Sequence, residues 1–393
     1  MYTSDLPNPK AAHLSPAHAE VITATLPAVG ANIETITTTF YAKMFAAHPE
    51  LIADLFNRGN QKQGAQQKAL AASVATFATQ LVDPHAPDPV MMLDRIAHKH
   101  VSLGITAEQY QIVHDNLMAA IAEVLGDAVT PEVAEAWDAV YWLMADVLIA
   151  HEAKLYASDG VAAGDVFRTA TVTEKTQLTD GVTTYTLSGD FSAPRPGQYT
   201  SVGVRLPDGA RQLRQYSIIG GDAQHYRIAV ATEGEVSTFL HDHVGVGDTV
   251  DATLAAGDLV LHEGDGPVVL VSSGIGSTPL VGILGALAAA GSPRPVTYIH
   301  ADSSEETWAQ REETRQLIAS LDDASLHAAL REAGERIDIA ALAEKDLAGA
   351  DVYLCGGTAF LKAIRSDIDA LPPEKAPKAV HFELFSPNDW LVS

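Results

Sequence analysis

His100 is the residue whose surroundings in this 393-residue chain most directly indicate chemistry. On a helix that turns by about 100° per residue, Leu93 and Ala97 share one face with His100, whereas His98 points roughly the other way. A neutral imidazole that faces an apolar interior is the group that a haem iron binds as its axial ligand, and a hydrogen-bond partner on its other nitrogen would make it more basic. The chain contains 15 histidines, and a hydrogen-bonded core histidine is the commoner alternative for this helix taken alone.

A second candidate is the glycine-containing turn Gly274-Ile275-Gly276-Ser277-Thr278-Pro279, which follows the apolar run 268–271. Such a turn lets a pyrophosphate approach the backbone, while the N-terminus of the following helix supplies amide donors and a favourable dipole. The third glycine of the usual dinucleotide fingerprint is absent, and Asp302 is the one acidic residue near the spacing of a ribose ligand. The turn alone therefore fits a nucleotide site and a structural glycine turn about equally well.

A third candidate is Arg214-Gln215-Tyr216-Ser217. Arginine can bind a pyrophosphate through two parallel hydrogen bonds, tyrosine can lie against an isoalloxazine ring, and serine can hydrogen-bond a flavin nitrogen. The alternative is an ordinary strand with a surface arginine.

The order of the flanking motifs favours the flavin interpretation. Arg195-Pro196-Gly197-Gln198-Tyr199 precedes the Arg214 motif, Gly234-Glu235-Val236-Ser237 follows it, and the nucleotide turn comes after both. This order resembles the FAD and nicotinamide module of ferredoxin-reductase-like enzymes. Cys355-Gly356-Gly357 matches the end of that family's nicotinamide-binding strand, with the difference that the family more often has proline after the first glycine.

Composition limits the possible partners and the cellular location. A net charge of -25 makes nucleic acid and anionic membrane surfaces poor partners, because binding to phosphates depends on Lys and Arg. The single cysteine excludes an internal disulfide, and the N-terminus lacks the basic start and apolar core of a signal peptide, so we expect a cytoplasmic protein. The uncharged run 268–291 is long enough to span a membrane, but the polar turn at 272–279 interrupts it, so we expect no membrane span.

The first part of the chain, residues 1 to about 156, predicts helices almost throughout. Ser15-Pro16 offers an N-cap followed by proline at the first helical position, and no alternating strand pattern competes with the helical spacing. The segment 157–164 is small and polar and is typical of a linker between domains. The helices that we expect run through 16–26, 33–45, 66–77, 91–100, 107–125 and 131–156.

The remainder of the chain changes character twice. Short Thr- and Val-rich runs at 169–173, 182–187, 198–202 and 226–230 predict a small antiparallel β-barrel. From residue 267 on, strands at 268–271, 296–299, 352–355 and 379–382 alternate with helices at about 277–290, 305–320 and 358–370, which predicts a doubly wound parallel sheet.

An all-helical domain with an axial-type histidine, followed by a reductase module, resembles a flavohaemoglobin of the nitric oxide dioxygenase type. The resemblance covers nearly the whole chain, apart from roughly the first dozen residues. It implies a globin domain at 1–156, a linker at 157–164, an antiparallel β-barrel FAD domain at 165–263 and a doubly wound α/β NAD(P)H domain at 264–393.

The resemblance also implies a role for each matching residue. Around the haem it assigns His100 as the iron ligand, with Tyr110 and Glu152 as the pair that orients and charges it. It assigns Tyr41 and Gln66 as distal residues, with Leu70 beside Gln66 as a further haem-site residue, and Phe56 as the phenylalanine that wedges the haem. At the flavin and nicotinamide it assigns Tyr199, Arg214, Gln215, Tyr216, Ser217, Val236, Ser237, Gly274, Ile275, Gly276, Ser277, Thr278, Pro279, Cys355 and Gly356. Lys99 and Glu383 match residues near the haem–flavin junction, and Phe385-Ser386-Pro387-Asn388 matches a tail over the flavin, in which Ser386 and Asn388 differ from the family's usual residues.

The implied activity is the conversion of nitric oxide and oxygen to nitrate, with electrons from NADH, or less readily NADPH, passing through FAD to haem b. We expect these small molecules as partners and a monomer. Two other functions fit the same residues. One is an oxygen-binding or redox-sensing haemoglobin that its own reductase keeps reduced, and the other is a haem-free flavin reductase that serves a separate acceptor.

Overall fold

The computed structural model describes residues 14–49, 51, 65–83, 85–86, 89–342 and 347–385, with only the backbone described at 65–72 and at Met91. The chain divides into two compact units. The helical unit extends to Phe167 and includes Arg205–Leu213, and the second unit contains most of the chain from Arg168 onward. The further division of the second unit at residue 263 stays a prediction. Among the described residues, no helix combines the length and apolar character needed to cross a membrane.

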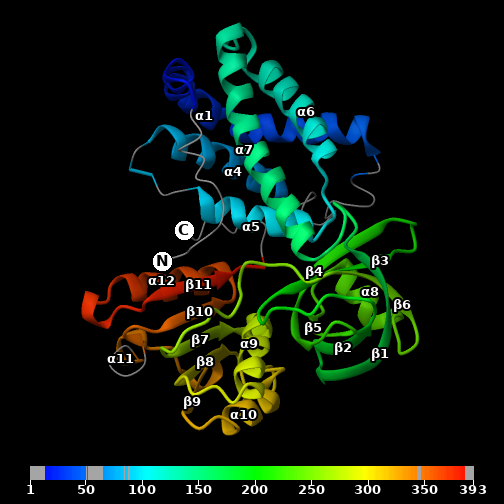
Figure 1. The fold of residues 1–393 in the computed structure, drawn as a ribbon, viewed down its shortest axis with the longest axis vertical. Helices are drawn as coiled ribbons and strands as arrows, with labels where there is room; N and C mark the ends of the chain where they lie inside the picture. Colours follow the sequence, from blue (N-terminus) through cyan, green and yellow to red (C-terminus); the bar gives the residue numbers. More distant parts are fainter. Residues whose placement is uncertain are drawn as a thin grey trace. The chain divides into compact units, whose positions relative to one another are not determined.

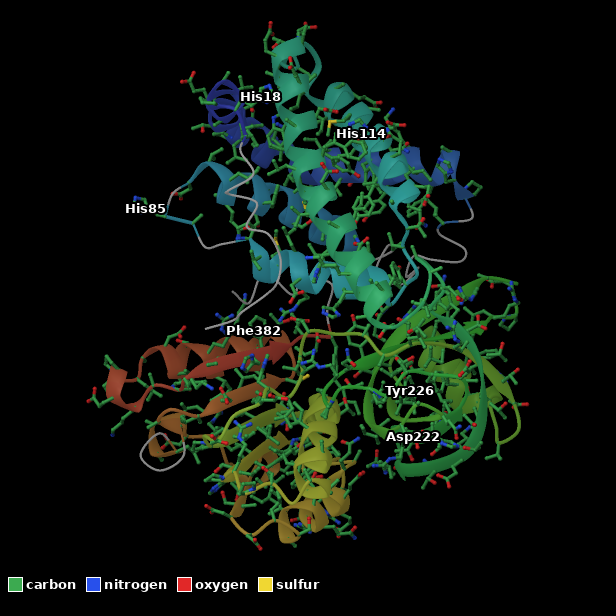
Figure 2. The ribbon with its side chains drawn as sticks, viewed as in Figure 1. His18, His85, His114, Asp222, Tyr226 and Phe382 are labelled. Carbon is green, nitrogen blue, oxygen red and sulfur yellow. The ribbon has the colours of Figure 1, made fainter. Side chains whose placement is uncertain are left out.

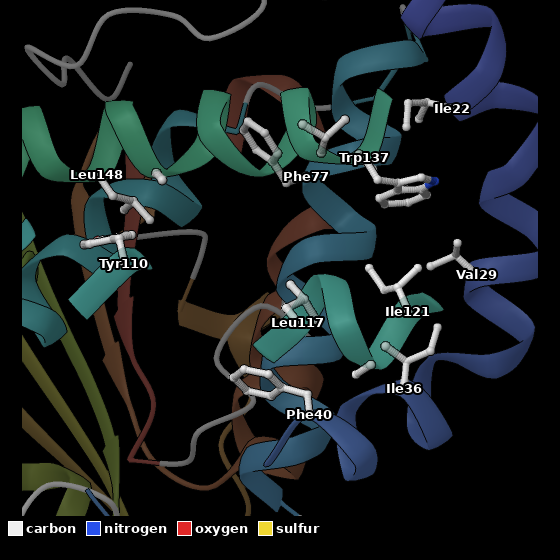
Figure 3. Close-up of a cluster of buried hydrophobic side chains, with 14 of the residues drawn as sticks. Ile22, Val29, Ile36, Phe40, Phe77, Tyr110, Leu117, Ile121, Trp137 and Leu148 are labelled. Carbon is white, nitrogen blue, oxygen red and sulfur yellow. The ribbon is translucent and has the colours of Figure 1, made fainter. Parts of the chain in front are cut away.

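The helical unit is built from five α-helices in its described part (Figure 1). The helix α1 packs on α4, α6 and α7, and α5 packs on α7. Figure 3 shows the shared core, where side chains such as Phe40, Leu117 and Trp137 meet from different helices. The elements are α1 (Pro16–Ala47), α4 (Ala65–Val82), α5 (Val90–Val101), α6 (Ala107–Leu125), the 3₁₀ turn η2 (Gly126–Ala128) and α7 (Pro131–Ser158).

Helix starts follow the caps in the sequence. Ser15 Oγ accepts a hydrogen bond from the His18 backbone N–H at 3.1 Å, and Pro16 occupies the first turn of α1. Thr130 caps α7 in the same way, with Pro131 next. The caps therefore fix where these helices begin.

The helix α1 differs from the expectation of two separate helices. It is one helix of 32 residues that continues through Pro27. Proline removes one backbone donor, but residues before and after it, Ile22 and Val29, are both buried in the same core cluster. Packing of this one continuous face holds the helix together across the proline.

The predicted β-barrel is present, and most of its residues belong to the second unit. Its strand order is β1-β2-β5-β4-β3-β6, and the barrel is closed. The ring of Tyr226, labelled in Figure 2, stacks on Phe191 with 4.1 Å between centroids, and its hydroxyl donates to the Ser192 carbonyl at 2.6 Å. The elements are β1 (Phe167–Thr179), β2 (Val182–Ser188), β3 (Tyr199–Arg205), β4 (Arg211–Gly221), β5 (His225–Ala231), α8 (Glu235–His243) and β6 (Thr249–Thr253).

The predicted parallel sheet has the strand order β11-β10-β7-β8-β9. In β7, Val268 and Leu270 belong to one core cluster and Val269 and Val271 to another, so apolar residues cover both faces of the sheet. The elements are β7 (Val268–Ser273), η3 (Gly274–Gly276), α9 (Ser277–Ala289), β8 (Val296–Asp302), α10 (Arg311–Ala319), β9 (Ala324–Leu330), η4 (Arg331–Ala333), α11 (Ile339–Leu342), β10 (Asp351–Cys355), α12 (Thr358–Asp369), η6 (Pro373–Lys375) and β11 (Ala379–Glu383).

Two details of this sheet differ from the sequence analysis. The edge strand β9 was not expected, because its residues are mostly small or polar and only one of the seven is fully buried. The helix expected from about residue 305 begins at Arg311. The intervening residues form turns, in which Thr307 Oγ1 donates to Asp302 at 2.5 Å and accepts from the Ser304 N–H at 3.1 Å. These side-chain bonds compete with the helical hydrogen-bond pattern and delay its start.

Candidate functional site

The side chain of His100 on α5 meets two side chains from two other helices. Glu152 Oε1 on α7 lies 2.8 Å from His100 Nδ1, and the Tyr110 hydroxyl on α6 lies 3.0 Å from the same nitrogen. Tyr110 also donates to Glu152 Oε1 at 2.5 Å. The structure thus brings together three residues that the family resemblance assigned to one group, from positions 10 and 52 residues away from His100.

The hydrogen-bond network assigns the proton on the imidazole. The single hydroxyl proton of Tyr110 is donated to Glu152, so Tyr110 cannot also donate to His100 Nδ1. The Nδ1 atom therefore carries the proton, and its N–H donates to the Glu152 carboxylate. Burial, and after it the negative charge of Glu152, raises the pKa of Tyr110 above its usual value, which keeps the phenol protonated. The lone pair of His100 therefore lies on Nε2.

Packing and turn geometry hold His100 in place at the last turn of α5. Leu93 and Ala97, on the same helix face, are fully buried in the helical core. After the helix, Gly104 has a φ of +70°, and a Cβ there would lie 2.9 Å from the Phe167 ring. The Tyr141 hydroxyl donates to the Tyr110 backbone carbonyl at 2.6 Å and so fixes the partner residue as well.

These residues fit a haem iron. Within the described residues, His100 Nε2 has no hydrogen-bond partner, and 32% of the His100 side chain is exposed. An imidazole whose other nitrogen donates to a buried carboxylate is a strongly donating axial ligand. The donor set is therefore the one expected for the axial side of a haem.

The distal residues are described only in part. Tyr41 is buried on α1, with its ring centroid 4.7 Å from that of Phe40 and 5.4 Å from that of Phe45. Gln66 and Leu70 lie on α4, where only the backbone is described, and Phe56 lies outside the described residues. Their assigned roles stay predictions.

The flavin candidates gather on β3 and β4, which are neighbours in the barrel. Gln215 Nε2 donates to Ser201 Oγ at 3.3 Å, and Ser217 is buried. Burial raises the pKa of Tyr216. Arg214 lies on the same strand. The sequence analysis missed Gly257, where a Cβ would lie 2.9 Å from the Tyr199 ring, so glycine is what allows this close packing.

The candidate residues at α8 form a helix N-terminus. Ser237 Oγ accepts from the backbone N–H groups of Glu233 and Gly234 at 3.0 and 2.9 Å, and Val236 is fully buried. The first amides of this helix point toward its N-terminal end, where a phosphate is stabilised by the helix dipole. The hydroxyl of Ser237 is engaged by the backbone of this turn, so we expect the backbone amides and not this hydroxyl to contact a ligand.

The nucleotide turn lies where the strand order of the parallel sheet reverses. The strand β7 is followed in the chain by β8 on one side, and β10 lies on the other. A Cβ at Gly276 would lie 2.5 Å from the Cys355 carbonyl oxygen, and one at Gly356 would lie 2.4 Å from Ser273 Oγ. The two turns thus touch at the carboxyl ends of β7 and β10, where open α/β sheets bind nucleotides.

The other residues of this turn are tightly engaged. Ser277 Oγ donates to Gln310 Oε1 at 2.5 Å, and Thr278 Oγ1 donates to the Ile275 carbonyl at 2.9 Å. Ser277, Thr278 and Pro279 are all buried at the start of α9. A nucleotide would therefore contact the backbone of the turn more than these side chains.

The remaining candidates are spread over both units. Lys99 lies on α5 of the helical unit, and Glu383 lies at the end of β11 in the second unit, paired in register with Cys355. Phe385 is 53% exposed, and Ser386, Pro387 and Asn388 lie outside the described residues. The roles assigned to these residues stay predictions.

A cluster that the sequence analysis did not find lies beside His100 on the same two helices. His151 Nε2 is 2.6 Å from Asp94 Oδ1, and His98 Nε2 is 3.9 Å from the same oxygen. The spacing of Asp94 and His98, four apart on one helix, was a signal for two of the three residues. His151 could be added only once α5 and α7 were packed together.

The fold and the site define a helical domain with a candidate haem-ligand histidine, followed in the chain by a reductase-type module. A globin family model matches residues 38–148. The chain is 39% identical to a flavohemoprotein of Deinococcus radiodurans and 33% identical to one of Bacillus subtilis, over 95% and 94% of this chain and 98% and 96% of those proteins. This protein belongs to the flavohemoprotein family, and its reductase module makes it an oxidoreductase.

Solved structures agree with this assignment. A flavohemoglobin from Malassezia yamatoensis, crystallised with bound FAD and heme, superposes with a TM-score of 0.87 at 33% identity and covers 95% of this chain and 100% of that one. The flavohem-like FAD/NAD-binding domain of a nitric oxide dioxygenase from Vibrio cholerae matches 55% of this chain and 98% of its own, with a TM-score of 0.50 at 32% identity. The expected fold class, a helical globin domain followed by a barrel and a parallel sheet, is confirmed.

Proposed function

We propose that this protein is an NAD(P)H-dependent nitric oxide dioxygenase. In the balanced reaction, two nitric oxide molecules, two oxygen molecules and one NAD(P)H give two nitrate ions, one NAD(P)⁺ and one proton. The observation that carries the proposal is the Glu152 carboxylate 2.8 Å from His100 Nδ1. The naming of a Vibrio cholerae relative as a nitric oxide dioxygenase supports it.

The proposed cofactors are haem b, FAD and NADH or NADPH. The Malassezia yamatoensis relative was crystallised with FAD and heme, and the residues of this chain fit both. When bound, the haem supplies an iron that takes up diatomic gases and single electrons, while FAD accepts a hydride and releases its two electrons one at a time.

In the helical unit, the carboxylate of Glu152 places negative charge beside the proposed iron ligand. His100 is the proposed iron ligand through Nε2, while its Nδ1–H donates to Glu152. This donation gives the imidazole partial imidazolate character and so increases electron donation through Nε2. Tyr110 donates to the same carboxylate and so holds it in place beside His100.

Tyr41 is the proposed hydrogen-bond donor to the oxygen substrate. Its hydroxyl would orient the oxygen substrate and stabilise negative charge that develops on it. Packing of its ring against Phe40 and Phe45 limits the rotamers available to the side chain.

In the second unit, the residues bind and orient the electron carriers. Arg214 and the N-terminus of α8 would bind the FAD pyrophosphate, and Tyr199 and Tyr216 would lie against the ring system. The backbone of the turn at Gly274–Gly276 would bind the pyrophosphate of NAD(P)H at the N-terminus of α9. The nicotinamide would then lie near Cys355 and Gly356 at the end of β10.

The test is NADH oxidation by the haem- and FAD-loaded protein in aerated buffer, before and after addition of nitric oxide, with nitrate assayed at the end. We expect a burst of NADH consumption, with two nitrates formed for each NADH consumed. A rate of NADH oxidation that does not depend on nitric oxide, with no nitrate formed, would contradict the proposal and favour a haemoglobin that its reductase keeps reduced. A parallel series with NADPH measures the cofactor preference.

A further inference from the structure

Asp94, His98 and His151 place three metal-ligating groups together on the two helices that also carry His100 and Glu152. Asp94 and His98 lie on α5, and His151 lies on α7. One ligand atom from each residue lies within 4.8 Å of the others, and among the described residues this is the one such group of histidine, cysteine and carboxylate side chains. Their side chains are only 8%, 15% and 10% exposed, in that order.

Two imidazoles approach one carboxylate oxygen. His151 Nε2 is 2.6 Å from Asp94 Oδ1, and His98 Nε2 is 3.9 Å from the same oxygen. A purely structural Asp–His pair would need only one imidazole.

We propose that Asp94, His98 and His151 form a binding site for one divalent transition-metal ion of the Zn²⁺ class, held between α5 and α7. Two imidazoles and a carboxylate are ligands that zinc binds readily, and a water molecule would complete a tetrahedron. The inference concerns a different ion from the haem iron and does not depend on the proposed function.

The distances suit such an ion after small side-chain movements. Zinc binds imidazole nitrogen at about 2.0–2.1 Å and carboxylate oxygen at about 2.0–2.2 Å, so tetrahedral donors lie roughly 3.3 Å apart. The observed separations of 2.6 and 3.9 Å from Asp94 Oδ1 lie on either side of that value. His98, the most exposed of the three side chains, gives solvent and the ion access to the site.

The position of the cluster gives the site a structural consequence. His98 is two residues before His100, and His151 directly precedes Glu152. A metal ion that bridges α5 and α7 would therefore tie together the two helices that carry the His100–Glu152 pair. Because the ion binds only the folded state, Zn²⁺ should also raise the melting temperature of the helical unit.

The experiment is a Zn²⁺ titration by isothermal calorimetry on the full-length, haem- and FAD-loaded protein after removal of free metal with a chelator. We expect one tight equivalent per chain, and a loss of affinity of about tenfold or more in both His98→Gln and His151→Gln. His114→Gln is the matched control, because His114 bonds Asp115 and Asp138 but belongs to no such ligand group among the described residues. Figure 2 labels this residue on α6.

Three results would overturn the proposal. They are no tight Zn²⁺ equivalent in the wild type, wild-type affinity in both cluster variants, or an equal loss of affinity in His114→Gln. Should a cluster variant fail to fold, the zinc X-ray absorption spectrum of the wild-type protein decides the question by itself. Scattering from two imidazoles is the expected result, and a sulfur ligand or a shell of oxygen alone contradicts the site.

Discussion

At the scale of single residues, the group around His100 is ordered by its hydrogen bonds. Glu152 is only 3% exposed in its side chain and accepts from both Tyr110 and His100. A carboxylate this deeply buried keeps its charge only when donors surround it. The negative charge is therefore available to the imidazole, and its removal is the sharpest single-residue test of the site.

We predict that Glu152→Gln lowers nitrate-forming turnover about 10- to 100-fold, the range typical of partners that orient a metal ligand. The midpoint potential of the haem should rise, because the neutral amide no longer increases electron donation by His100. Turnover with nitric oxide and spectroelectrochemical titration measure the two effects. Glu123→Gln, which alters the exposed Lys43–Glu123 ion pair, is the control, and an unchanged potential in Glu152→Gln would remove Glu152 from its proposed role.

At the scale of elements, the turn between β7 and α9 depends on close backbone approach. Gly276 leaves no room for a Cβ, since the Cys355 carbonyl oxygen would lie 2.5 Å from it. At Gly285, farther along α9, an added Cβ would have no atom of the described residues outside its own helix within 4 Å. The same substitution at these two positions therefore separates the geometry of the turn from the general effect of alanine in the helix.

Gly276→Ala should raise the KM for NADH in flavin reduction at least about tenfold, because the shifted turn loses backbone contacts to the pyrophosphate. Gly285→Ala should leave KM unchanged and stabilise α9 by about 0.5–1 kcal/mol, the usual difference between glycine and alanine in a helix. Steady-state reduction of ferricyanide measures both variants. Equal KM values in the two variants would show that the nucleotide binds elsewhere.

The edge strand β11 carries a histidine that is held neutral. The His381 ring stacks on His262 and Tyr353 with centroids 4.3 and 4.9 Å apart, and its Nε2 is buried without a partner among the described residues. Burial, and then the nearby His262, lowers the pKa of His381 to about 4. Between that value and an unfolded-state pKa of about 6.5, the unfolded chain binds more protons than the folded one.

The free energy of unfolding of the second unit should therefore fall as the pH is lowered from about 6.5 toward about 4. In His381→Phe, which keeps an aromatic ring in the stack, this part of the pH dependence should be lost. Urea unfolding at a series of pH values gives the comparison, with His327 on β9 as a histidine-to-phenylalanine control. A pH dependence of His381→Phe identical to that of the wild type would contradict the assignment.

At the scale of the whole molecule, the candidate residues separate by unit. His100, Tyr110, Glu152 and Tyr41 belong to the helical unit, with its own apolar core, while the flavin and nicotinamide candidates belong to the second unit. Each unit buries its own core, so loss of a ligand in one should leave the other folded.

His100→Ala should abolish stable haem binding and leave NADH-driven reduction of the flavin within about twofold of the wild type, as expected for separate cores. The Soret band and the rate of ferricyanide reduction report the two activities. His114→Ala, on α6 and outside the candidate site, should keep both. Simultaneous loss of haem and flavin reduction in His100→Ala would mean that the two units do not fold independently.

Much of the fold could be predicted from local sequence. The Ser15-Pro16 cap indicated the start of α1, helical spacing indicated α6 and α7, Thr- and Val-rich runs indicated most barrel strands, and the alternation of strands and helices indicated the parallel sheet. These signals depend on residues only a few positions apart, so they can be recognised from the sequence alone. Family resemblance, and not periodicity, assigned Tyr110 and Glu152 to His100.

Tertiary packing decided the rest. The continuity of α1 through Pro27, the edge strand β9 and the close contact of Gly276 with Cys355 all depend on residues far apart in the chain. The Asp94–His151 contact joins residues 57 apart, and His98, which the helical spacing placed on the face away from His100, completes that cluster. The sequence by itself determined most of the elements that form and singled out His100 as a candidate ligand. Only the packing of α5 on α7 placed two imidazoles, those of His98 and His151, at one carboxylate, because such proximity is a property of the folded chain.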